Sequence, residues 1–174
     1  MTLAHTSMTY EFFARTDKGR VRTNNEDAVA VDREAQVAIL ADGMGGYNAG
    51  EVASGMATTF IRTEMARWLA QAGTTPQSTD VRRALEICVE NANHAILGAS
   101  LSNPQYAGMG TTLVVAVFHG SRLILGHIGD SRCYRLRAGR RHRRHRRWRR
   151  RCGRRARPGG PGWRPRPCRR APSP

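Results

Sequence analysis

The segment 37–51, which reads VAILADGMGGYNAGE, constrains the fold more than any other part of the chain. It begins with five apolar residues, a length and composition typical of a buried strand, and this run ends at Asp42. Gly43, Gly45 and Gly46 follow, and glycines permit a sharp turn and a close approach of the backbone to a ligand. A carboxylate beside a peptide carbonyl offers the hard oxygen ligands that Mg²⁺ or Mn²⁺ prefers. The pattern by itself predicts either a metal site at the end of a strand or a glycine-rich turn whose aspartate caps the next helix.

The preceding residues predict the other half of a β-hairpin. Residues 28–31 form a short apolar strand pattern, and the segment 32–35, which reads DREA, turns the chain back into 37–41. In an antiparallel pair the start of one strand lies beside the end of the next. We therefore expect Glu26, Asp27 and Asp42 to meet at one end of the sheet.

The spacing of apolar residues predicts the other elements. Apolar side chains recur every four residues from Ala49 to Ala72, which predicts a helix that stops at Gly73. A second helix is expected over 81–97, with Thr79 or Asp80 as its N-cap. Aromatic residues favour a strand over 10–14, and three apolar runs joined by short turns predict a meander over 113–118, 123–128 and 133–136. The pattern favours a packed core role for His127 over a catalytic one.

The charge is distributed very unevenly along the 174 residues. The net charge is +16, yet residues 1–139 contain 13 lysines and arginines and 13 acids, while residues 140–174 contain 16 arginines and no acid. The first part has the composition of one ordinary globular domain, and the second does not. The four cysteines have no zinc-ligand spacing, which favours reduced thiols. We find no export signal or apolar run of membrane-spanning length, so we expect a soluble, cytoplasmic protein.

Four short motifs occur in order: RxxNED (22–27), DGMGG (42–46), GMGTT (108–112) and GDSR (129–132). Together they make the chain resemble the metal-dependent PPM or PP2C family of serine/threonine protein phosphatases, especially its bacterial branch. The resemblance covers about residues 10–139. It implies an α+β fold, a four-layer αββα sandwich, with two Mn²⁺ or Mg²⁺ ions at one end. Residues 1–9 are then an N-terminal extension.

The resemblance also implies roles for six residues. Asp42 matches the carboxylate that bridges both metals, Gly43 would supply a carbonyl, and Glu26 and Asp27 match the acidic pair that supports the centre. Asp130 matches an aspartate that helps to hold a third metal, and Arg22 matches the clamp on the substrate phosphate. The implied reaction is hydrolysis of phosphoserine or phosphothreonine on proteins by a metal-activated water. The implied partners are phosphorylated proteins and a cognate kinase.

Two departures from the family pattern affect the expected activity. Met44 stands where many eukaryotic members have a histidine, so another group must protonate the leaving group. The two later aspartate segments of the family are missing, because Asp130 is the last acidic residue. We therefore expect a phosphatase domain that is incomplete on its C-terminal side, poorly folded and nearly inactive.

The arginine-rich residues 140–174 have two interpretations, and both predict disorder in isolation. They could form an arm that binds nucleic acid, attached to a phosphatase-like module without catalytic activity. Alternatively, arginine mixed with proline, glycine and alanine is what a GC-rich gene encodes out of frame. We favour a frameshift near codon 139, which predicts that a neighbouring reading frame encodes the missing aspartate motifs.

Overall fold

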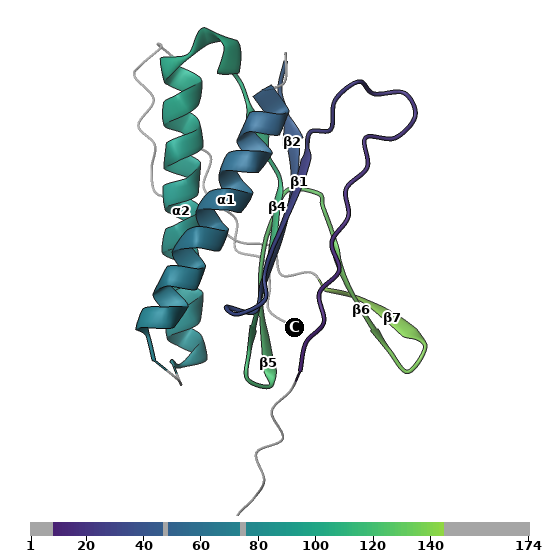
Figure 1. Cartoon of the computed structure of the whole chain (residues 1–174), viewed down its shortest axis with the longest axis vertical. Coiled ribbons are helices and arrows are strands. Elements are labelled where there is room, and N and C mark those ends of the chain that lie inside the picture. Colours follow the sequence, from purple (N-terminus) through teal and green to yellow (C-terminus); the bar gives the residue numbers. More distant parts are fainter. Residues whose placement is uncertain (1–8, 47–48, 74–75, 145–174) are drawn as a thin grey trace, which may run out of the picture.

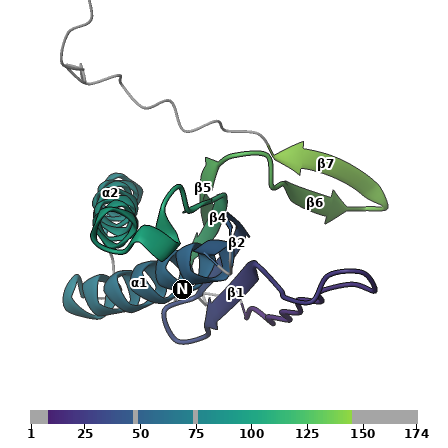
Figure 2. The same cartoon turned by 90° about the horizontal axis from the view of Figure 1, so that it is seen from above.

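The computed structural model describes residues 9–46, 49–73 and 76–144. A five-stranded antiparallel sheet contains, in spatial order, β1 (Asp27–Asp32), β2 (Val37–Met44), β4 (Leu113–His119) and β5 (Arg122–Ile128), and the short β3 (Gly110–Thr111) also pairs with β2. Helices α1 (Ala49–Gln71) and α2 (Ser78–Ser102) cover one face of the sheet (Figures 1 and 2). A 3₁₀ turn, η1 (Pro104–Tyr106), leads back to the sheet, and a separate hairpin follows it, made of β6 (Cys133–Arg137) and β7 (Arg140–Arg144).

The main core lies between the two helices and the sheet. Alternate residues of β2, including Val37 and Ile39, point into it and meet Ile61 and Met65 from α1. The four-residue spacing of the α1 side chains puts them on one stripe of the helix, as the sequence predicts. Neither described helix is both long and apolar enough to cross a membrane.

The predicted hairpin is confirmed, but β2 is longer than expected. Asp27 lies directly opposite Asp42 in the ladder between β1 and β2. The sequence placed Asp42 at the end of its strand, whereas β2 continues to Met44, because Gly43 and Met44 pair with β3. Asp42 therefore lies within a paired strand, between β1 on one side and Thr111 and Thr112 on the other.

The strand predicted over 10–14 does not form, and the strand predicted over 133–136 forms but pairs outside the meander. Residues 10–14 form no strand, because Tyr10 and Phe12 use their rings to pack on Phe118 of β4, at centroid distances of 4.8 and 5.4 Å. The meander ends after β5, since the turn that begins at Gly129 (φ 89°) leads the chain away from the sheet. The strand after this turn, β6, pairs with β7 instead of β5.

Helix α2 begins three residues earlier than predicted and continues five residues further. Its N-cap is Gln77, whose side chain makes no capping hydrogen bond, instead of Thr79 or Asp80. Both of those residues lie inside the first turn, where Asp80 is favourable beside the positive end of the helix dipole. At the other end, Asn103 is the C-cap of α2, and its side chain accepts a hydrogen bond from the Gln105 N–H at the start of η1.

The predicted disorder from residue 140 does not hold for 140–144. These residues form β7, and the turn before it places Ala138 (φ 49°) and Gly139 (φ 71°) in the left-handed region. A two-residue loop of this kind matches the twist of a hairpin, and a ladder between two strands requires only backbone groups. The rest of the predicted tail, 145–174, lies outside the described residues, as does most of the predicted N-terminal extension 1–9.

The α+β class is confirmed, with one helical layer on one sheet. The face of the sheet away from the helices is partly covered by the N-terminal segment, and the β6–β7 hairpin lies on the same side (Figure 2).

Candidate metal and phosphate site

Asp42 lies at one end of the sheet, directly opposite Asp27 in the ladder between β1 and β2. The pKa of Asp42 is raised above its usual value, first by partial removal from water, then by the charge of Asp27 and a hydrogen bond with its side chain, and then by the charge of Asp130. Arg22 acts in the opposite direction and favours the charged form. The charges of Asp27, Asp130 and Arg22 therefore all act on Asp42, which lies directly opposite Asp27 in the ladder.

Two threonines fix the backbone of Asp42. The Asp42 N–H donates to the Thr112 hydroxyl at 3.1 Å, and the Asp42 carbonyl accepts from the Thr112 N–H at 2.8 Å and from the Thr111 hydroxyl at 3.0 Å. Three hydrogen bonds from another segment leave this backbone little freedom. The Asp42 carboxylate is therefore attached to a backbone whose position is held by the neighbouring segment.

Thr112 also connects Asp42 to the turn that carries Asp130. The hydroxyls of Thr112 and Ser131 lie 2.6 Å apart and share a hydrogen bond, and the carbonyl of Ser131 accepts from His127 Nε2 at 2.5 Å. A Cβ on Gly129 would lie 2.8 Å from the Thr112 methyl group, so only glycine allows this close approach. His127 is buried, as the sequence predicts, and its role is to anchor this turn.

Glu26 occupies a different place from the other carboxylates. Its backbone carbonyl accepts from the Gly43 N–H at 3.0 Å, but its side chain turns toward the start of α1. There, Glu26 Oε1 lies 2.7 Å from the position that a Cβ on Gly50 would take. A carboxylate is favourable beside the N-terminus of a helix. Glu26 therefore contacts β2 through its backbone carbonyl and the start of α1 through its carboxylate.

The backbones of β2 and α1 meet closely at Gly43. A Cβ on Gly43 would lie 2.0 Å from the Gly50 carbonyl oxygen, which no real structure could accommodate without movement. The glycine after Asp42 is thus required by helix packing in addition to any role of its carbonyl.

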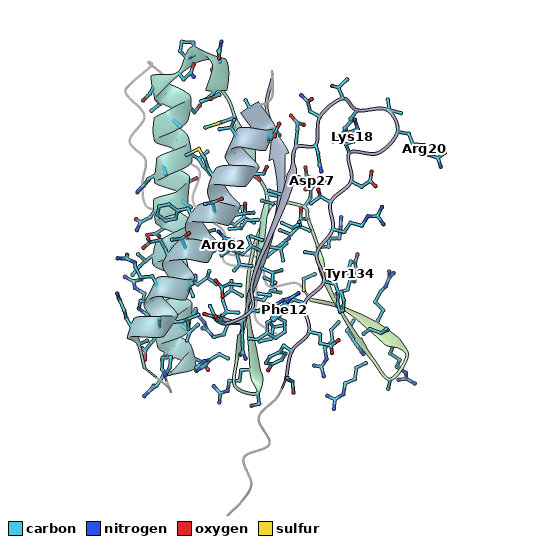
Figure 3. The ribbon with its side chains drawn as sticks, viewed as in Figure 1. Phe12, Lys18, Arg20, Asp27, Arg62 and Tyr134 are labelled. Carbon is cyan, nitrogen blue, oxygen red and sulfur yellow. The ribbon has the colours of Figure 1, made fainter. Side chains whose placement is uncertain are left out.

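Arg22 lies on the exposed loop that precedes β1. Lys18 and Arg20 mark this loop in Figure 3. The loop is held at its base, where the Asn25 amide donates to the Thr16 hydroxyl at 2.5 Å, and at its tip, where the Gly19 N–H donates to Asp17 at 2.9 Å. The charge of Arg22 acts on Asp42 and favours its ionised form. A phosphate that approaches the site meets this cation.

The donor set suits divalent cations that prefer oxygen. Within the described residues, no three His, Cys, Asp or Glu side chains are arranged to hold one ion. Mg²⁺ normally keeps several waters and uses one or two carboxylates, so a full protein cage is not required. The close contact of Asp42 with Asp27, which raises the pKa of Asp42, is what a bound cation would relieve. By this test the residues present fit Mn²⁺ or Mg²⁺.

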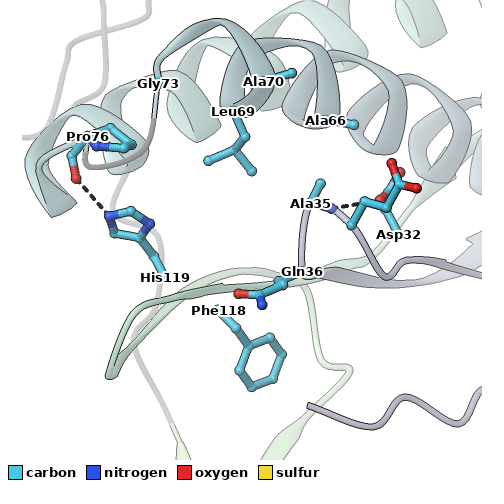
Figure 4. Close-up of a pocket in the computed structure, with 11 residues that line it drawn as sticks. Asp32, Ala35, Gln36, Ala66, Leu69, Ala70, Gly73, Pro76, Phe118 and His119 are labelled. Carbon is cyan, nitrogen blue, oxygen red and sulfur yellow. Dashed lines mark hydrogen bonds between the residues drawn. The ribbon is translucent and has the colours of Figure 1, made fainter. Parts of the chain in front are cut away.

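The cavity at the other end of the sheet is separate from this site. It has a volume of about 300 Å³ and lies between the β1–β2 turn, the end of α1 and His119 (Figure 4). The His119 ring shares a 2.7 Å hydrogen bond with the Pro76 carbonyl. None of the predicted site residues lines this cavity.

Sequence reasoning identified the acidic residues and Arg22 but gave no role to the residues that position them. Thr111 and Thr112 were visible as part of GMGTT, and Ser131 as part of GDSR. Their function depends on contacts between segments about 20 to 70 residues apart. Spacing within one motif could not reveal these contacts.

Comparison with known proteins gives a consistent result. The family model described as "Protein phosphatase 2C" matches residues 16–146. The serine/threonine protein phosphatase PstP of Mycobacterium tuberculosis is 41% identical over 137 residues, which are 79% of this chain and 25% of that protein. The serine/threonine phosphatase stp of Listeria monocytogenes is 37% identical over 125 residues, which are 70% of this chain and 48% of that protein.

Solved structures agree with these matches. The catalytic domain of PstP, in complex with two manganese ions, aligns with a TM-score of 0.64 at 40% identity, over 74% of this chain and 52% of that one. The chain thus spans from a quarter to about half the length of these relatives. From the matched motifs, the shared fold and the family model, the chain belongs to the protein phosphatase 2C family of metal-dependent serine/threonine phosphatases.

Proposed function

We propose that this chain carries the N-terminal part of the catalytic centre of a metal-dependent phosphatase that acts on phosphoserine and phosphothreonine in proteins. The observation that supports the proposal is that Asp42 lies opposite Asp27 in the ladder at one end of the sheet and feels the charges of Asp27, Asp130 and Arg22. The named relatives are serine/threonine phosphatases, and one structure contains two manganese ions.

Each residue has a defined part in this proposal. Asp42, Asp27 and Asp130 would hold Mn²⁺ or Mg²⁺, the Gly43 carbonyl would add a neutral oxygen ligand, and Glu26 would support the centre from behind. Such ions, when bound, supply an acidified water and neutralise charge on the phosphoryl oxygens.

The remaining residues orient the substrate and the ligands. Arg22 would bind the phosphate of the substrate through its planar guanidinium. Thr111 and Thr112 hold the Asp42 backbone, so little rearrangement is needed when the charge of the phosphate arrives. Met44 cannot protonate the leaving group, so this proton must come from water or another group.

The proposal extends to the biological setting. The protein would act in the cytoplasm on proteins that a cognate serine/threonine kinase has phosphorylated. The phosphatase would oppose that kinase, since hydrolysis removes the phosphate that the kinase transfers.

The test measures phosphate release from a phosphothreonine peptide with and without Mn²⁺. We expect slow, Mn²⁺-dependent release by this chain, abolished by Asp42→Ala and kept by Asp80→Ala, which removes an acid far from the site on α2. Arg22→Ala should raise KM more than it lowers kcat if Arg22 mainly binds ground-state phosphate.

Weak activity of this chain could come from its incomplete fold or from a wrong assignment of function, and a chimera separates these two causes. Residues 16–146 of this chain would be joined to the remaining catalytic half of the Listeria phosphatase, so that the family fold is complete. We expect release to rise well above that of the chain alone and to depend on Asp42. A folded chimera that releases no phosphate, or an Asp42→Ala chimera that stays fully active, would show that the proposal is wrong.

A further inference from the structure

The β6–β7 hairpin concentrates positive charge on one of its faces. In its register Arg135 is opposite His142, and Arg137 is opposite Arg140. Side chains alternate along a strand, so these four residues share one face, with two-residue steps of roughly 6.6 Å along each strand. The result is a compact grid of basic groups on a ribbon two strands wide.

No acidic residue of the hairpin balances this charge. Asp130 is the last acid in the sequence, and none of the ion pairs in the described part of the chain includes a hairpin arginine. Like charges directly opposite each other in a ladder are unfavourable. A bound polyanion would remove this repulsion and release counterions.

The other face of the hairpin combines an aromatic ring with an arginine. The Arg141 guanidinium lies 4.9 Å from the centre of the Tyr134 ring, and Leu136 beside them is 73% exposed. An exposed ring flanked by arginine is a surface on which nucleic-acid bases stack. The hairpin lies clear of the helices in both views (Figures 1 and 2). Residues 134–142 are all exposed, so both faces of the hairpin are open to a ligand.

We propose that the β6–β7 hairpin binds single-stranded nucleic acid. Unpaired bases would stack on Tyr134, beside Arg141 and Leu136 on one face. The strand would then pass around the edge of the two-stranded ribbon, so that neighbouring phosphates reach Arg135, Arg137, Arg140 and His142 on the opposite face. An acidic peptide offers charge without bases, and a duplex keeps its bases stacked inside, so each would use only part of this surface. The inference does not depend on the phosphatase proposal, and it requires no divalent metal.

The test compares two variants of the full chain that lose the same charge. The hairpin variant is Arg135→Gln/Arg137→Gln/Arg140→Gln, and the control is Arg33→Gln/Arg62→Gln/Arg82→Gln, three exposed arginines outside the hairpin. Binding of a fluorescent oligothymidylate is followed by anisotropy over a range of salt concentrations. The arginines of residues 145–174 are present in every variant and contribute equally to each.

We expect the hairpin variant to lose about tenfold or more in affinity, and the slope of log K against log salt to fall by about 2, since each contact contributes roughly 0.7 on single strands. The control should change affinity by less than about twofold. The charge-preserving variant Arg135→Lys/Arg137→Lys/Arg140→Lys should keep the slope of the parent. Equal losses in the hairpin and control variants would overturn the proposal.

A second measurement separates nucleic acid from other polyanions. Tyr134→Leu keeps an apolar side chain but removes the ring, and should weaken oligothymidylate binding by about fivefold. It should leave binding of polyglutamate and of a duplex of equal length unchanged. Polyglutamate that binds the parent as tightly as oligothymidylate, or an equal effect of Tyr134→Leu on all three ligands, would show that the hairpin attracts only negative charge.

Discussion

The two faces of the main sheet are both apolar, but only one is fully covered. On β2, Ile39 points toward the helices and is 3% exposed, while its neighbour Leu40 points the other way and is 41% exposed. The same contrast separates Val117 of β4 from Leu123 of β5. A strand that is apolar on both faces is suited to a buried sheet with a layer on each side. The helices supply one layer, and the N-terminal segment supplies part of the other.

The largest expected effect comes from the two neighbours on β2. Ile39→Ala should lower the free energy of unfolding by about 2–5 kcal/mol, because it leaves a cavity beneath the helices. Leu40→Ala should cost about 1 kcal/mol or less, since this side chain is already partly in water. Chemical denaturation of both variants measures the difference. Equal losses would mean that the second face is as well packed as the first.

The next effect concerns the contact between β2 and α1 beside Asp42. Gly43→Ala should destabilise the fold by about 1–3 kcal/mol, because its Cβ would overlap the Gly50 carbonyl and the helix must move. Gly46→Ala is the control, because a Cβ there would meet nothing within 4 Å. Thermal unfolding of the pair tests this contact, and identical curves would contradict it.

A smaller effect should come from the N-terminal cover of the second face. Phe12→Ala removes a ring that packs edge-on against Phe118 and should cost about 0.5–1.5 kcal/mol. Phe13, the adjacent residue, is 91% exposed, so Phe13→Ala should leave stability unchanged. If the two variants unfold alike, the segment does not cover the sheet.

The smallest effect is a difference in thiol chemistry. Burial of its side chain in the core beneath α2 raises the pKa of Cys88 from its usual 9.0 to about 11. The buried neutral thiol contributes fully to the free energy of unfolding below about pH 9, and this contribution is lost as the pH rises through about 11. At neutral pH, site-resolved alkylation should therefore be slower at Cys88 than at the half-buried Cys133. Faster labelling of Cys88 in the folded chain would contradict its burial.

The sequence predicted what depends on local periodicity. Helix α1, both strands of the first hairpin and the pairing of Asp27 with Asp42 follow from alternation and four-residue spacing. It did not predict that residues 10–14 pack through their rings, because an aromatic run suits both a strand and a cover over a sheet. Nor did it predict β7, whose arginines show no apolar pattern and whose partner is set by the turn at Ala138 and Gly139.

The sequence likewise predicted some features of the candidate site and not others. Its charged residues were visible as motifs, and the charges of Asp27, Asp130 and Arg22 do act on Asp42. The separate position of the Glu26 carboxylate and the link from Asp42 through Thr112 to Ser131 required the tertiary structure. Those contacts join β1, β2, β3 and the turn after β5, which no single stretch of sequence contains.

The central claim is that the carboxylates around Asp42 bind divalent cations, and the most direct test is the response of thermal unfolding to Mn²⁺. Without metal, Asp42→Asn should be at least as stable as the parent, because the raised pKa shows that the folded state disfavours the charged carboxylate. With Mn²⁺, the account predicts a higher unfolding temperature for the parent and for Asp80→Asn, and no change for Asp42→Asn. An equal rise in all three proteins would place the metal elsewhere and contradict the account.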